Sequence, residues 1–187
     1  MNVFPEDPFE KVFPDAPDST SSLGVSFSVQ PVQKCRFRYD SERNGKSKAK
    51  CELKASSGKL PQIEILNLID VHTVNVKVSF LNKDGNPHFL QLYKAGKSNN
   101  KFYDNYCEII ASIDTSKTMH YIDLDGIGIG FLKKKDKPIN ISDAAYKMYK
   151  DSVKLLVEVT AISHSHNTEY NYTISNDITH QATSQQI

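Results

Sequence analysis

The stretch QPVQKCRFRYDSE occupies residues 30–42, and its alternating side chains predict a strand with one polar face. On an extended backbone, Arg36 and Arg38 share one face and Phe37 points to the other. Phe37 would then anchor the strand in a core, while two planar guanidiniums face outward. Such forks of N–H donors can contact two acceptors on one guanine edge, or grip a phosphate. A half-buried strand with two solvated arginines is the alternative interpretation of the same pattern.

The residues after the arginines also suit a surface that contacts nucleic acid. Tyr39 can stack on a base or cover a sugar, and Glu42 can accept from a cytosine amino group or orient the arginines. Lys46 follows on a loop that Asn44-Gly45 allows to turn. Basic residues outnumber acidic ones between residues 34 and 59, although the net charge of the chain is only +1. The positive signal is therefore local.

Length and composition indicate a globular protein without a cofactor. The chain has 187 residues, 39% of them hydrophobic and 24% charged, which is enough for one domain with tails. The three cysteines, Cys35, Cys51 and Cys107, are too few and too irregularly spaced for a disulfide framework or a zinc site. The acidic N-terminus is no signal peptide, and no apolar run reaches membrane-spanning length. We therefore expect the nucleus and cytoplasm, and, since no nucleophile–base pair stands out, no enzyme.

Apolar and polar residues alternate in many short runs, which predicts strands. The strongest signal is the alternation of valines over residues 74–80. Asp143 is expected to cap a short helix over residues 144–150. Such a pattern is typical of an all-β fold, an immunoglobulin-like antiparallel β-sandwich with one short helix near the C-terminus. The expected strands lie at residues 25–29, 60–65, 74–80, 89–93, 106–113, 119–124, 127–132 and 153–162.

Both ends of the chain are expected to be disordered. Residues 1–22 interleave prolines with acids and cannot bury enough apolar surface to offset their ordering entropy. Residues 164–187 are polar and contain three histidines, at positions 164, 166 and 180, but a metal site is not expected there. The sequence therefore predicts a disordered leader over 1–22, a β-sandwich domain over 23–163, and a polar disordered tail over 164–187.

The order of these features resembles a known family. Gln-Pro followed by Arg-Phe-Arg-Tyr-x-x-Glu is similar to the recognition loop of the Rel homology region in Rel/NF-kappa-B proteins. The variant with Ser41 is most similar to the insect Relish type. Residues 60–67 resemble the family's Pro-x-Val-x-Ile-x-Asn strand, and Gly128-Ile129 followed by lysines 133–135 resembles its glycine-isoleucine segment. The resemblance runs from residue 29 to about residue 162, the N-terminal DNA-binding part of that region.

The resemblance implies a function and its contacts. Arg36 and Arg38 would contact guanines in the major groove, and Glu42 would pair with a cytosine. The chain would be a transcription factor domain that reads GG-rich half-sites in double-stranded DNA and acts in innate immunity. The residues expected to contact DNA are Arg36, Arg38, Tyr39, Ser41, Glu42, Lys46, Lys133 and Lys134.

A second function stays open. The family's dimerisation domain has no counterpart in this sequence, and neither have the ankyrin repeats of Relish-type precursors. The chain would then be a protein-interaction module that binds or competes with Rel-family factors without reading DNA. Besides DNA, the expected partners are another Rel-family protein or an ankyrin-repeat inhibitor; no membrane is expected.

Overall fold

The computed structural model describes residues 22–39, 41–42, 52–95, 98–103 and 105–181. The 3₁₀ helix η1 (Lys134–Asp136) and the α-helix α2 (Asp143–Tyr149) lie in this part, and residues 41 and 42 are helical as well. The rest is built from strands: β1 (Gly24–Val29), β2 (Lys34–Cys35), β3 (Arg38–Tyr39), β4 (Gln62–Leu66), β5 (Val71–Leu81), β6 (Gln91–Lys94), β7 (Lys101–Phe102), β8 (Tyr106–Ser112), β9 (Met119–Asp123), β10 (Ile127–Phe131), β11 (Ser152–Ser163), β12 (Thr168–Ile174) and β13 (Ile178–His180).

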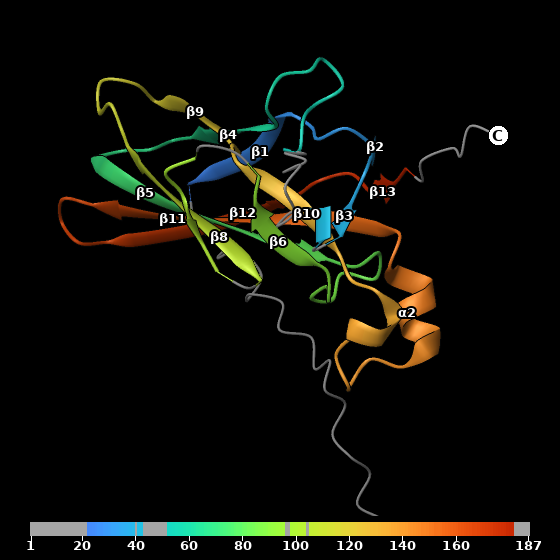
Figure 1. Ribbon diagram of the computed structural model, residues 1–187. Helices are drawn as coiled ribbons and strands as arrows, with labels where there is room; N and C mark the ends of the chain where they lie inside the picture. Colours follow the sequence, from blue (N-terminus) through green and yellow to red (C-terminus); the bar gives the residue numbers. More distant parts are fainter. Residues whose placement is uncertain (1–21, 40, 43–51, 96–97, 104, 182–187) are drawn as a thin grey trace, which may run out of the picture.

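The strands form one large sheet and two small ones (Figure 1). The large sheet has seven strands in the order β2-β13-β11-β5-β8-β7, with β12 paired to β11 beside β13. The small sheets have the orders β1-β4-β9 and β3-β10-β6. All three contribute to a single hydrophobic core. The predicted all-β, immunoglobulin-like sandwich with one short helix late in the chain is therefore confirmed.

The core follows from the alternation seen in the sequence, because every second side chain of a half-buried strand points inward. In β5 and β11, inward valines lie opposite each other across the strand pair, and isoleucines of β4 and β10 join the same core. Residues 127–131 form β10, close to the strand predicted over 127–132, and Gly126 lies in the turn before it with a φ of 73°. The buried side chains that carry this pattern are Val76, Val78, Val157, Val159, Ile63, Ile65, Ile127 and Ile129.

Most predicted boundaries differ from the observed ones by one to three residues, and two of these differences have a visible cause. The helix cap is Ser142 and not Asp143, because the Ser142 hydroxyl accepts from the Ala145 N–H (3.1 Å). The strand expected from residue 89 begins at Gln91. Its start is delayed because the Leu90 N–H donates to His88 Nδ1 (2.9 Å) and so is not available to a neighbouring strand.

The prediction of a disordered polar tail from residue 164 is wrong for residues 168–174 and 178–180, which form β12 and β13. β12 pairs with β11 from Thr168↔Ile162 to Ile174↔Leu156, and Ile178 of β13 has no exposed surface. The segment is polar in composition because β12 lies at an edge of the sheet, where few of its side chains enter the core. The expected disorder of the leader and of the last six residues concerns positions 1–21 and 182–187, outside the described residues.

Candidate nucleic-acid interface

The segment with the two arginines bridges the edges of two sheets. β2 pairs in parallel with β13 of the large sheet, and β3 pairs in parallel with β10 of a small sheet. These are the parallel pairs among the described strands of a sandwich that is otherwise antiparallel. We call residues 34–39 with Ser41 and Glu42 the recognition segment. Its two ends are fixed to different sheets, so residues 36 and 37 cross between them.

Phe37 anchors the recognition segment, as the alternation predicted. Its side chain is only 1% exposed and lies in the core cluster. The ring packs against the rings of Phe131 (centroids 6.5 Å apart) and His180 (5.2 Å). Because Phe37 points inward, Arg36 and Arg38 are directed to the other face, and their side chains remain 39% and 20% exposed.

Glu42 joins the two arginines on that face. Its Oε1 atom forms an ion pair with the guanidinium of Arg36, and a second with Nη1 of Arg38 at 3.3 Å. Its Oε2 atom accepts from the Tyr39 N–H at 3.0 Å. One carboxylate therefore holds both guanidiniums side by side and ties them to the backbone, which agrees with the expectation that Glu42 orients the arginines. Its pairing with a cytosine stays a prediction.

The contacts of Glu42 also fix its charge. Partial burial raises the pKa of this carboxyl, but the Tyr39 N–H and the positive charges of Arg36 and Arg38 outweigh it, and the pKa of Glu42 is lowered. Glu42 is thus ionised at neutral pH and remains a pure acceptor. Each guanidinium carries five N–H groups, of which Glu42 engages only some.

Tyr39 and Lys133 extend the arginine face. The Tyr39 ring lies edge-on against Phe131 (4.9 Å), which fixes its position half-buried beside β10. Lys133 Nζ lies 5.7 Å from the centre of that ring, within cation–π range. Lys133 follows β10 directly, so the pairing of β3 with β10 is what brings the predicted lysine run next to the predicted arginines.

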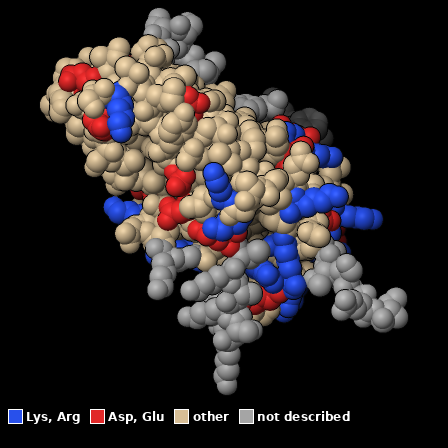
Figure 2. Space-filling model, turned by 90° about the horizontal axis from the view of Figure 1, so that it is seen from above, with Lys and Arg blue, Asp and Glu red and all other residues tan. Residues whose placement is uncertain are grey.

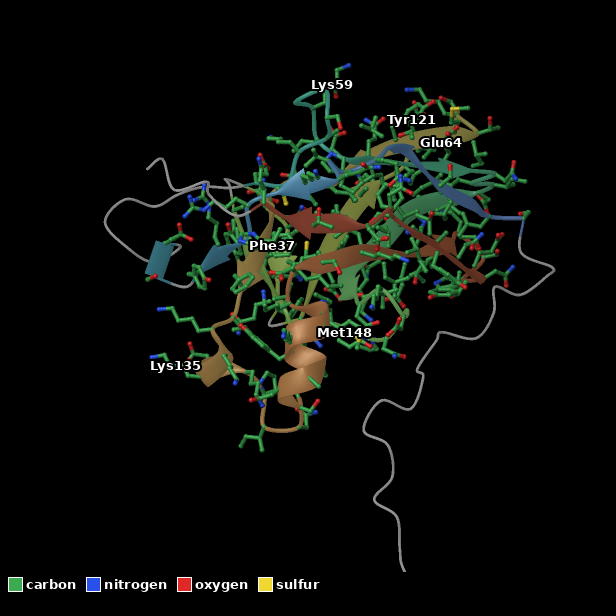
Figure 3. All side chains as sticks on the ribbon, turned by 90° about the vertical axis from the view of Figure 1, so that its right-hand side faces the viewer. Phe37, Lys59, Glu64, Tyr121, Lys135 and Met148 are labelled. Atoms are coloured by element: carbon green, nitrogen blue, oxygen red, sulfur yellow. The ribbon has the colours of Figure 1, made fainter. Side chains whose placement is uncertain are left out.

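The rest of the lysine run is on and beside η1. Lys134 Nζ pairs with Asp143 at the start of α2 (2.7 Å), and Lys137 approaches the same carboxylate (3.5 Å). Lys135 is exposed and points away from the protein on the side of the molecule where β3 lies (Figure 3). Of the two lysines predicted to contact phosphate, Lys133 therefore faces the recognition segment and Lys134 is engaged by Asp143.

The distribution of charge agrees with this placement. Figure 2 shows Lys and Arg side chains concentrated over the right half of the molecule, mixed with acidic residues, while the left part is mostly uncharged. The right half corresponds to the part of Figure 1 that holds β2, β3, β13 and α2. On the face that Figure 2 draws, more Lys and Arg side chains thus lie toward the end that carries the recognition segment, interspersed with acidic ones.

Two predicted contact residues and one unpredicted residue complete the site. Ser41 is exposed beside Glu42, and Lys46 lies outside the described residues. His180 was assigned to a disordered tail, but its ring contacts both Phe37 and Phe131. The alternation of Tyr170, Tyr172 and Ile174 with polar residues was the signal that a strand precedes it.

Among the described residues there is neither a metal-type cluster nor a membrane-spanning helix. No three His, Cys, Asp or Glu side chains among them gather into a cluster that could hold a metal ion. None of their helices has the length and apolar character needed to cross a membrane. Cys35 in β2 and Cys107 in β8 form no disulfide bond within the described residues.

Comparison with known proteins identifies the family. The sequence model of the Rel homology DNA-binding domain matches residues 25–181. The chain belongs to this family. No curated protein matches the sequence. Among solved structures, the Rel-type domain is similar to "Dorsal homologue Gambif1 bound to DNA", with a TM-score of 0.55 and 21% identity. That match covers 84% of this chain and 99% of the other, and at this identity it shows a shared fold.

The match to the family's sequence model also corrects the predicted C-terminal boundary of the Rel-type domain. It includes β12 and β13, which the sequence analysis placed outside the domain, and it ends one residue after His180. The recognition segment and the strand that supports it therefore belong to the same domain.

Proposed function

We propose that this Rel-type domain binds double-stranded DNA through the recognition segment and reads a GG-rich half-site in the major groove. The observation that supports it most is the pair of half-exposed guanidiniums, Arg36 and Arg38, held together by Glu42. Two neighbouring forks match two successive guanines, since each guanine presents the O6 and N7 acceptors on its major-groove edge. A transcription factor of this kind acts in the nucleus, so we propose the nucleus and cytoplasm as its location.

The arginines would supply the sequence preference. Each bidentate arginine–guanine pair contributes about 1–3 kcal/mol of discrimination against the wrong base. The Phe37 anchor and the Glu42 bridge hold the two forks before DNA arrives, which lowers the entropy lost on binding. Glu42 lies between the forks and would accept from the amino group of the cytosine paired with a guanine.

The lysines would supply affinity without preference. Lys133 lies free of an acidic partner in the described structure, above the Tyr39 ring, where it can meet a phosphate of the same strand. Lys134 would first have to exchange Asp143 for a phosphate. With few phosphate contacts, binding of a single half-site is expected to be weak. The logarithm of its association constant should fall linearly with the logarithm of the salt concentration.

The test compares a GG-containing duplex with a scrambled duplex of the same length at low salt. Arg36→Lys and Arg38→Lys keep the charge but lose the fork, so each should reduce the preference by about tenfold while binding to the scrambled duplex persists. Lys117→Ala is the matched control. Lys117 lies in the turn between β8 and β9, at the opposite end of the molecule from β3 in Figure 1, and should change neither affinity.

Equal binding of the unmutated chain to both duplexes would remove the proposed half-site. Binding to neither duplex, together with capture of a Rel-family protein that survives loss of both arginines, would support the interaction module instead. The finer likeness to the Relish type rests on Ser41 alone. Ser41→Cys should make DNA binding sensitive to thiol oxidation, because position 41 lies beside Glu42 in the recognition segment; unchanged binding after oxidation would argue against a DNA contact at this position.

A further inference from the structure

The strand β13 holds the backbone at the start of the recognition segment by hydrogen bonds. The Thr179 N–H donates to the Gln33 carbonyl (2.8 Å), and the Gln181 N–H donates to the Cys35 carbonyl (2.8 Å). β13 is itself held by β11, because the His180 N–H donates to the Asp151 carbonyl (2.7 Å). β13 therefore couples the large sheet to the residues that immediately precede Arg36.

The side chain of His180 continues this support to the peptide between the two arginines. Its Nδ1 atom accepts from the Phe37 N–H at 3.0 Å. Its ring lies between the rings of Phe37 (5.2 Å) and Phe131 (5.1 Å). The Phe37 N–H belongs to the peptide that links Arg36 to Phe37, so this hydrogen bond sets the direction in which the segment leaves the core.

The hydrogen bond exists only while His180 Nδ1 is unprotonated, because a protonated ring nitrogen cannot accept. Four charged groups face the ring: Lys150 and Asp151 between α2 and β11, and Arg36 and Glu42 of the recognition segment. From β10 the ring meets only the uncharged Phe131. Burial lowers the pKa of His180 below its usual value. The carboxylates of Asp151 and Glu42 raise this pKa, but by less than burial lowers it. His180 is thus neutral at pH 7.

We infer that His180 is a positioning residue for DNA reading: neutral Nδ1 holds the peptide between Arg36 and Arg38, and its protonation releases that peptide and weakens the preference for GG. The inference rests on the proposed function. A proton on Nδ1 would place an N–H against the Phe37 N–H and a positive charge near Arg36. Both effects displace the two forks from each other, while Lys133 and the other cations remain available to phosphates.

The first test measures the ratio of affinities for GG and scrambled duplexes as the pH is lowered stepwise from 7.5, for as long as the sandwich stays folded. In the unmutated chain the ratio should fall about threefold to tenfold as the pH drops, the effect of losing one hydrogen bond. His180→Asn places an amide oxygen where Nδ1 lies and has no titrating group, so it should keep the ratio constant over this range. His180→Ala should have the lower ratio at every pH. Binding to the scrambled duplex should be the same in all three chains at each pH.

The second test needs no DNA and so separates this inference from the proposed function. The hydrogen-exchange protection of the Phe37 amide should be lost in His180→Ala and kept in His180→Asn, with the Val76 amide in β5 as the control. If His180→Ala does not fold, the protection of the Phe37 amide is compared between the unmutated chain and His180→Asn as the pH is lowered. Protection should then be lost only in the unmutated chain. Absence of any GG preference at pH 7.5 would remove the proposed function, and the Phe37 amide alone would then test the support by His180.

Two outcomes would overturn the role of His180. One is a Phe37 amide that stays protected in His180→Ala, or that stays protected in the unmutated chain down to the lowest pH at which the sandwich is folded. The other is a GG preference whose pH profile is the same in His180→Asn as in the unmutated chain. Far-UV circular dichroism at each pH checks that the sandwich itself is intact during both measurements.

Discussion

Truncation of Phe37 to alanine should lower both the stability of the domain and its ability to read DNA. The Phe37 side chain is 1% exposed and packs against two rings, so removal leaves a cavity under the recognition segment. Phe→Ala changes in cores cost about 3–5 kcal/mol. For a domain of this size, each kcal/mol shifts the melting temperature by about 2–4 °C, so we expect a decrease of roughly 6–20 °C. The anchor between the two arginines is lost as well, and the preference for GG should fall by about tenfold, the value of one well-placed bidentate pair.

A control variant separates the two effects. Ile65 in β4 is equally buried but lies in a different sheet from the recognition segment, and Ile65→Ala should cost about 2–5 kcal/mol. Urea denaturation measures the stabilities, and duplex binding is measured at a temperature where both variants are folded. Phe37→Ala should lose the preference and Ile65→Ala should keep it. Equal preference in the two variants, or a stability loss below about 1 kcal/mol for Phe37→Ala, would refute the anchoring role.

Three further predictions concern the body of the sandwich. A Cβ on Gly128 would lie 2.4 Å from the Tyr93 ring, so Gly128→Ala should lower the free energy of unfolding by about 1–3 kcal/mol in urea titrations. Burial lowers the pKa of His88 to about 4, whereas the unfolded chain binds this proton near pH 6.5. The free energy of unfolding should therefore decrease by about 3 kcal/mol as the pH falls from 6.5 to 4. His88→Gln, which lacks the titrating group, should show a shallower pH dependence. Burial raises the pKa of the Cys107 thiol to about 12, so iodoacetamide at pH 8 should leave Cys107 unmodified in the native chain and alkylate it in urea. Peptide mass spectrometry measures the modification. Equal rates of modification in both states would contradict the packing of β8.

Much of the fold could be predicted because a strand with one buried face repeats every second residue. The valines of β5 and the β-branched run of β11 carried this signal clearly, and both strands lie where it placed them. The strands β12 and β13 carried it weakly. An edge strand buries few side chains, and Ile178, the buried residue of β13, stands alone among polar neighbours. Pairing with β11 orders this segment, and pairing partners leave no mark on local composition.

The site was predicted only as far as neighbours in sequence determine it. The inward Phe37 and the outward arginines follow from a period of two, and Glu42 lies close enough in sequence to reach both of them. The proximity of Lys133 to Tyr39 depends on the pairing of β10 with β3, which the sequence analysis did not predict; the family resemblance only placed both residues among the DNA contacts. The contact of His180 with Phe37 depends on β13, and no local pattern indicates it.

The hydrogen bond from Phe37 to His180 joins positions 143 residues apart in the chain. Contacts of such separation close late, since a long loop must first lose its freedom. On the ribosome the arginines leave the exit tunnel well before β13 is made. In a partly synthesised chain, the peptide between its two cationic side chains therefore lacks the hydrogen bond from His180 until β13 has been made.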